Sequence, residues 1–157
     1  MKNPSVSALI TICESYNNSN LPGRDFLTLG GKPMYRIMVD KLLSVSQIDR
    51  IIVLSDSDRI NTEFAGNSRI QVISCPVDFS GDPNVRMSQE LPTSDWMVEH
   101  ALSKVNGEHF IQVQCINPFL TVETLEGALE RYYQYVLDNE AYFDSVMSLS
   151  RVDKRLY

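Results

Sequence analysis

Short runs of apolar, mostly β-branched residues alternate along this chain with segments of helical periodicity. Ile51–Leu54 is an unbroken apolar run, as expected of a strand that is covered on both faces. Strands of this kind need helices on both sides of the sheet, so the pattern predicts a parallel sheet. The five expected strands are Val6–Cys13, Ile48–Ser55, Ile70–Ser74, His109–Ile116 and Asp144–Leu149.

Helical segments are expected between these strands. Pro33 suits a first helical turn, where its missing N–H costs nothing, and an apolar stripe at helical spacing follows it. The strict alternation of strand and helix predicts one α/β domain over residues 1–157, built as a three-layer sandwich with a mostly parallel sheet. The expected helices are Met34–Val45, Ser57–Ala65, a segment capped by Thr93 or Ser94, and Thr121 to about Leu137.

The charge balance and the apolar segments exclude several classes of protein. The chain has 14 Lys and Arg against 20 Asp and Glu, a net charge of −6, so it lacks the basic field of a nucleic-acid binder. It has no apolar stretch that approaches the roughly 18 residues of a membrane span, and its first residues do not form a signal peptide. We therefore expect a cytoplasmic protein with neither a membrane nor a nucleic-acid partner.

The three cysteines are Cys13, Cys75 and Cys115. They are odd in number, far apart in the sequence and without the spacing of a metal site. Each follows or ends an apolar run, so we expect buried thiols in a reducing compartment rather than a zinc site or a disulfide.

Ligands of open α/β sheets bind at the carboxyl ends of the strands, where this chain carries polar loops. The loop after the first strand is neither a P-loop nor a dinucleotide fingerprint. It does carry Arg24 and, eight residues on, Lys32, two cations that can hold a triphosphate or remain solvated surface charges. After the second strand, Asp56 and Asp58 are more typical of helix capping than of metal binding.

Several segments, in order, resemble the motifs of the cytidylyltransferases that activate acidic sugars. The stretch Leu21–Met34 resembles their entry motif, in which Pro-x-Lys-Asn is followed by Leu-x-Gly-Lys-Pro-Leu. Gln112–Leu120 resembles Leu-Gln-Pro-Thr-Ser-Pro-Leu, which favours the acylneuraminate branch (CMP-sialic acid synthetases) over the Kdo branch. The other matching segments are Ile48–Asp56, Cys75-Pro76 with Ser80–Asp82, and Thr93-Ser94 before Val98–Leu102.

The resemblance implies the Rossmann-like sandwich of nucleotide-diphospho-sugar transferases and the transfer of CMP from CTP to an acidic sugar, with Mg²⁺ as cofactor and pyrophosphate as second product. It implies Arg24 and Lys32 as catalytic cations. The resemblance also implies a possible homodimer. The metal-binding aspartates of the family, and much of the segment that forms its dimer, would fall after Tyr157. The implied nucleotide-binding residues are Cys13, Arg24, Asp25, Lys32, Asp56, Ser94 and Asn117.

This sequence also departs from the family pattern. Glu14 lies in the region where the family has an arginine, Asp25 replaces an asparagine, and Cys75 replaces the arginine that holds the base. Two alternatives to an acidic-sugar cytidylyltransferase therefore stay open. One is a catalytically degenerate domain that binds a nucleotide or a partner, and the other is a nucleotidyltransferase with a different base.

Overall fold

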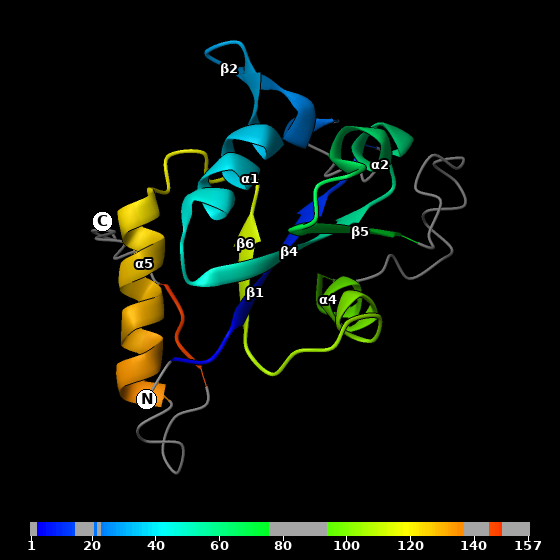
Figure 1. Cartoon of the computed structure of the whole chain (residues 1–157). Coiled ribbons are helices and arrows are strands. Elements are labelled where there is room, and N and C mark those ends of the chain that lie inside the picture. The colour runs from blue at the N-terminus through cyan, green and yellow to red at the C-terminus, as the bar shows by residue number, and fades with distance from the viewer. Residues whose placement is uncertain (1–2, 15–20, 22, 76–93, 137–144, 149–157) are drawn as a thin grey trace, which may run out of the picture.

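A four-stranded parallel sheet lies at the centre of the computed structural model, which describes residues 3–14, 21, 23–75, 94–136 and 145–148 (Figure 1). Its strand order is β5-β4-β1-β6, and each neighbouring pair is parallel. This confirms the predicted parallel α/β sheet. The strands are β1 (Val6–Ile12), β4 (Ile48–Ser55), β5 (Ile70–Ser74) and β6 (Phe110–Gln114).

Helices cover both faces of the sheet, as the alternation of elements predicted. On one face lie α1 (Met34–Ser44), α2 (Asp58–Phe64) and α5 (Val122–Arg131), and on the other lies α4 (Ser94–Leu102) (Figure 1). The strand β4 shows why its apolar run is unbroken. Ile51 and Val53 pack into the core beneath α1, whereas Ile52 and Leu54 pack beneath α4, and all four are 0% exposed. The predicted three-layer sandwich is therefore confirmed.

A short hairpin precedes α1 that sequence reasoning did not predict. Its strands β2 (Thr28–Leu29) and β3 (Lys32–Pro33) are antiparallel, and a two-residue turn joins them. Both turn residues have positive φ, +61° at Gly30 and +82° at Gly31, which is the backbone of a type I′ turn and suits glycine. Pro33 consequently ends the hairpin as the N-cap residue of α1 rather than lying inside the first turn.

The end of the chain departs from two predictions. The expected fifth strand is wrong for Ser145–Ser148, which form no strand. Val146, Met147 and Ser148 instead line a cavity of about 710 Å³ together with residues of β6 and α5, and Met147 is 80% exposed. The helix expected to run on to Leu137 changes form at Tyr132, whose N–H is shared between the carbonyls of Ala128 and Leu129, and continues as the π-helical turn η2 (Tyr132–Val136).

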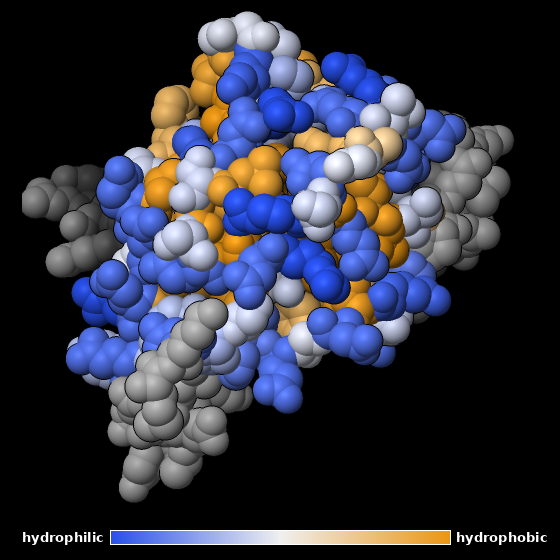
Figure 2. Space-filling model, viewed as in Figure 1, coloured by the Kyte–Doolittle hydropathy of each residue, from blue (hydrophilic) through white to orange (hydrophobic). Residues whose placement is uncertain are grey.

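One helix cap also differs from expectation. Ser57, not Asp56 or Asp58, is the N-cap residue of α2, and no side chain caps that helix. The helix expected from Thr121 does begin there, because Thr121 is the N-cap residue of α5 and its hydroxyl accepts a hydrogen bond from the N–H of Thr124 at 3.2 Å. None of the helices in the described ranges is long and apolar enough to cross a membrane. On the face shown in Figure 2, hydrophilic residues surround separate apolar patches.

Candidate functional site

The carboxyl ends of β1 and β4 are fastened together by buried polar groups. Ser55, 1% exposed, donates its hydroxyl to the carbonyl of Ile12 at 2.6 Å, and the same oxygen accepts from the N–H of Ser57 at 3.2 Å. Beside them the carboxylate of Asp56 accepts the N–H of Glu14 at 2.7 Å. Asp56 therefore fixes the start of the loop that follows β1, a structural role that sequence reasoning assigned to helix capping instead.

A single turn of 3₁₀ helix, η1 (Arg24–Phe26), places the first predicted cation at this edge of the sheet. It begins after Gly23, whose φ of +63° turns the chain, and it is closed by the N–H of Leu27 donating to the carbonyl of Arg24 at 3.1 Å. Asp25 anchors the turn from inside, because its carboxylate accepts the N–H of Cys13 at 3.1 Å. Burial raises the pKa of Asp25, although the hydrogen bond from Cys13 and the charge of Arg24 act in the opposite direction.

A cavity of about 160 Å³ opens where β1, β6, η1 and α4 meet. Arg24 is the only positively charged residue that lines this cavity in the described part of the chain. The buried Nε of Arg24 has no hydrogen-bond partner within the described ranges. Asp25 Oδ1 lies 3.5 Å from that nitrogen, which is an ion pair without a good hydrogen bond. The residues that line the cavity are Thr11, Cys13, Arg24, Asp25, Met97, Gln112, Val113, Gln114 and Cys115.

The size and chemistry of this cavity limit what it can hold. Whole small-molecule sites are typically about 300–1,000 Å³, so the cavity takes one part of a ligand rather than all of it. One guanidinium group, two amide side chains and one hydroxyl at its wall supply donors for an anionic group or for a polar ring. The arrangement therefore suits a phosphate group or a nucleobase.

The predicted nucleotide-binding residues are only partly brought together. Cys13, Arg24 and Asp25 line the cavity. Lys32 does not, because its ammonium group pairs with Asp40 of α1 at 2.8 Å. Asn117 lies after β6 at the separate cavity beside α5. Ser94 is the first residue of α4, and its side chain lies outside the described part of the chain.

Sequence reasoning missed the β6 contribution to this cavity. Gln112 and Gln114 alternate with the buried Val113, so both amides lie on the same side of the strand as the cavity. Two glutamines at a spacing of two residues within an otherwise apolar strand were the available signal. Met97 of α4 closes the cavity from the other side and is 4% exposed.

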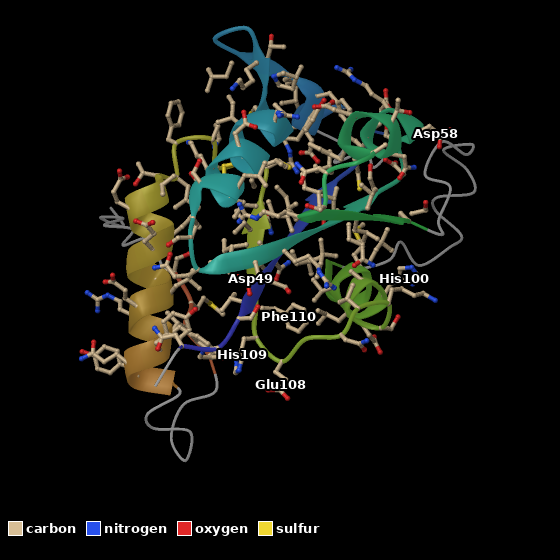
Figure 3. All side chains as sticks on the ribbon, viewed as in Figure 1. Asp49, Asp58, His100, Glu108, His109 and Phe110 are labelled. Atoms are coloured by element: carbon tan, nitrogen blue, oxygen red, sulfur yellow. The ribbon has the colours of Figure 1, made fainter. Side chains whose placement is uncertain are left out.

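The cysteines and histidines supply no further reactive centre here. Cys13 and Cys115 are buried as predicted, whereas the prediction is wrong for Cys75, which is only half-buried. Burial raises the pKa of the Cys13 and Cys115 thiols, which keeps them protonated. Among the described residues no group of three His, Cys, Asp or Glu side chains is arranged to hold a metal ion. His109 lies at the opposite, amino edge of the sheet, near Asp49 and Glu108 (Figure 3), and its Nδ1 is 2.8 Å from the hydroxyl of Tyr132.

Curated relatives of this chain are enzymes that act on an acidic sugar. It is 28% identical over 130 residues to the 3-deoxy-manno-octulosonate cytidylyltransferase of Cytophaga hutchinsonii, covering 80% of this chain and 47% of that protein. It is 25% identical over 123 residues to the protein of the same name from Escherichia coli, covering 78% and 45%. The chain thus spans about half the length of these relatives. They carry the octulosonate name rather than the acylneuraminate name that the sequence favoured.

Solved structures show the same fold at low identity. A CMP:2-keto-3-deoxy-manno-octonic acid synthetase complexed with CTP matches with a TM-score of 0.61 and 22% identity, over 83% of this chain and 48% of that one. The 4-diphosphocytidyl-2C-methyl-D-erythritol synthase of Anaerococcus prevotii matches with a TM-score of 0.58 and 18% identity, over 80% and 49%. The family model described as cytidylyltransferase matches residues 16–151. This chain belongs to the cytidylyltransferase family.

Proposed function

We propose that this protein transfers CMP from CTP to an acidic sugar and releases pyrophosphate. The observation that carries the proposal is the cavity at the carboxyl ends of β1 and β6, where Arg24, whose buried Nε has no hydrogen-bond partner in the described part of the chain, lies beside two glutamines. Family membership and the fold support the same chemistry, because ligands of such sheets bind at this edge. The activity is proposed for the whole protein, since the curated relatives are about twice as long.

In the proposed reaction a sugar hydroxyl attacks the α-phosphorus of CTP and gives up its proton to water. A P–O bond to the sugar forms, and the bond to the bridging oxygen of pyrophosphate breaks. Negative charge grows on the leaving oxygens, and a fixed cation lowers the barrier by stabilising that charge. Arg24 is suited to this role because Asp25 and the N–H of Cys13 hold its turn in place. The fork of the guanidinium group matches two phosphate oxygens at once.

The sugar is proposed as a 2-keto acid of the octulosonate or nonulosonate type. The curated relatives favour 3-deoxy-manno-octulosonate, whereas the Gln112–Leu120 motif favours an acylneuraminate. Both sugars carry a carboxylate next to the reacting carbon, so the proposed class is shared and only the member differs. Supplying each sugar separately distinguishes them.

Mg²⁺ is proposed as cofactor from the family resemblance alone. The described residues do not offer a donor set for it, because no three acidic, histidine or cysteine side chains converge. One carboxylate oxygen of Asp25 and one of Asp56 already accept the backbone N–H groups of Cys13 and Glu14. No step of the proposed reaction is assigned to the metal, and the need for it is measured by titration with and without Mg²⁺.

Nucleotide-dependent thermal stabilisation tests the proposal first. CTP, UTP, ATP and GTP are added separately, each with and without Mg²⁺, and a ligand at 100 times its Kd adds about 2.7 kcal/mol to stability. We expect stabilisation by CTP, followed by pyrophosphate release when the correct sugar acid is added. If only another nucleotide stabilises the protein, that nucleotide replaces CTP as the proposed substrate. If none of the four stabilises it, the proposed nucleotide site is refuted.

A second candidate is a domain that binds CTP without catalysing transfer. It is favoured by one specific observation, the buried carboxylate of Asp25 at 3.5 Å from the only cation of the cavity, which reduces the charge available to a transition state. CTP binding without pyrophosphate release from any acidic sugar supports this candidate. Pyrophosphate release excludes it.

A further inference from the structure

Lys32, the second cation that the resemblance implied, is held on the surface of α1 by one carboxylate. Its Nζ lies 2.8 Å from Oδ2 of Asp40, and the two side chains are 53% and 33% exposed. The other oxygen of Asp40 accepts from Nε of Arg36 at 2.9 Å. Asp40 is thus shared between a cation of the hairpin and a cation of its own helix.

The remaining contacts of this network do not involve Lys32. Arg36 also reaches Glu63 of α2 at 3.1 Å, and the second oxygen of Glu63 accepts the hydroxyl of Tyr35 at 2.5 Å. If Lys32 leaves, Asp40 keeps Arg36 and Arg36 keeps Glu63, so no charge is left alone. Lys32 is therefore the terminal member of the network.

The hairpin that carries Lys32 is fastened at its base and exposed along its length. At the base, the N–H of Met34 donates to the carbonyl of Leu27 at 2.9 Å. Every residue from Leu27 to Lys32 is exposed, and the turn at Gly30 and Gly31 projects away from the sheet (Figure 1). Within the described ranges, the ion pair to Asp40 is the contact that fixes where the ammonium group of Lys32 lies.

We propose that Asp40 is a positioning residue for Lys32, which holds the ammonium group on α1 in the free protein and yields it to a bound polyphosphate. Arg36 neutralises Asp40 after the exchange, so the carboxylate stays paired throughout. This inference rests on the proposed function, because the group that takes Lys32 from Asp40 is the triphosphate of a bound nucleotide. It predicts that Asp40 weakens polyphosphate binding by competing for Lys32.

The probe is inorganic tripolyphosphate, titrated calorimetrically into the full chain at low ionic strength. An exposed ion pair is worth about 0.2–1 kcal/mol, so Asp40→Asn is expected to bind tripolyphosphate up to about fivefold more tightly than the wild type. In a Lys32→Gln background the same substitution is expected to give no gain, because the group it releases is missing. An equal gain in both backgrounds would overturn the proposal.

Glu63→Gln is the matched control for a general effect of charge. The substitution removes one carboxylate from the same network. Glu63 contacts Arg36, as Asp40 does, but its ion pair and hydrogen bonds go to Arg36 and Tyr35 rather than to Lys32. Its affinity for tripolyphosphate is expected to stay within about twofold of the wild type. A gain as large as that of Asp40→Asn would show that the effect is only the loss of a nearby negative charge.

Acylation of the Lys32 amine, followed by peptide mass spectrometry, reports the exchange itself. Tripolyphosphate is expected to protect Lys32 in the wild type and in Asp40→Asn, and free Asp40→Asn is expected to react faster than the free wild type. Tripolyphosphate binding without protection of Lys32 overturns the inference while the proposed nucleotide site stands. If neither tripolyphosphate nor CTP binds to the wild type or to Asp40→Asn, both the inference and the proposed function fail.

Discussion

The buried carboxylate of Asp25 accepts the backbone N–H of Cys13 at 3.1 Å and so ties the turn that carries Arg24 to the end of β1. In the sequence, Asp25 is a departure from the family pattern, because it replaces an asparagine next to the expected phosphate-binding cation. In the structure Asp25 is 7% exposed and one of its oxygens is occupied by Cys13, so it fixes the position of Arg24. The turn is held in place at the cost of burying a charge.

Replacing Asp25 by asparagine is expected to stabilise the protein at neutral pH. Burial raises the pKa of Asp25 above its ordinary value near 3.9, so the ionised form destabilises the fold. An amide oxygen can still accept the N–H of Cys13. We expect Asp25→Asn to raise Tm at pH 7.5 by about 2–4 °C, which corresponds to roughly 1 kcal/mol in a domain of this size.

The pH dependence identifies the cause of that gain. A raised pKa in the folded state means that the wild type regains stability as the pH falls through that pKa, and the penalty is gone below about 3.9. The difference in Tm between Asp25→Asn and the wild type should therefore narrow between pH 7.5 and pH 4. A difference that stays constant or widens over this range would contradict the assignment.

Ser55 is expected to be the most sensitive small side chain at this edge. Its hydroxyl donates to the carbonyl of Ile12 and accepts from the N–H of Ser57, and Ser55→Ala removes both of these buried hydrogen bonds. The expected loss in the free energy of unfolding is about 1–3 kcal/mol, measured by urea denaturation with an unchanged m-value. Ser44→Ala is the control, because that exposed hydroxyl bonds only within α1 and should change stability by less than about 0.5 kcal/mol.

Tyr35 is expected to titrate late. Burial, together with the hydrogen bond to Glu63, raises the pKa of its hydroxyl to about 12, against an ordinary value near 10. The ultraviolet titration of the native wild type, minus that of Tyr35→Phe, should show a tyrosinate step near pH 12, and in denaturant the step should move to about pH 10. Because the folded pKa is raised, the contribution of Tyr35 to stability is present below pH 10 and lost as the pH rises through 12. A tyrosinate step near pH 10 in the difference between the native wild type and Tyr35→Phe would refute the raised pKa of Tyr35.

The strands and the layers of this fold are predictable from local sequence. An apolar run such as Ile51–Leu54 has one explanation, burial on both faces, and the structure places alternate residues in two cores. Ser145–Ser148 show the limit of the same pattern, because a strand also needs a neighbouring strand with which to form a ladder, and these residues form no strand. Whether such a neighbour is available depends on how distant elements of the chain pack, which a local pattern does not contain.

The candidate site is less predictable because its residues are chosen by topology and by competing partners. Arg24 and Cys13 were expected at the site, and the structure places both at one cavity. Lys32 was expected beside them, yet an aspartate eight residues later on α1 holds it elsewhere. The glutamines of β6 reach the site only because β6 pairs with β1, a pairing between residues about 100 positions apart in the chain.

Calorimetric titration of CTP into the wild type and Arg24→Gln tests most directly whether Arg24 binds the nucleotide. A hydrogen bond to a charged group is worth about 1.5–3 kcal/mol, so we expect CTP affinity to fall by about tenfold or more. Arg50→Gln is the matched control, since it removes the same charge from an exposed position at the amino end of β4 and should change the affinity by less than about threefold. Equal affinities for the wild type and Arg24→Gln, or an equal loss in Arg50→Gln, would contradict the account.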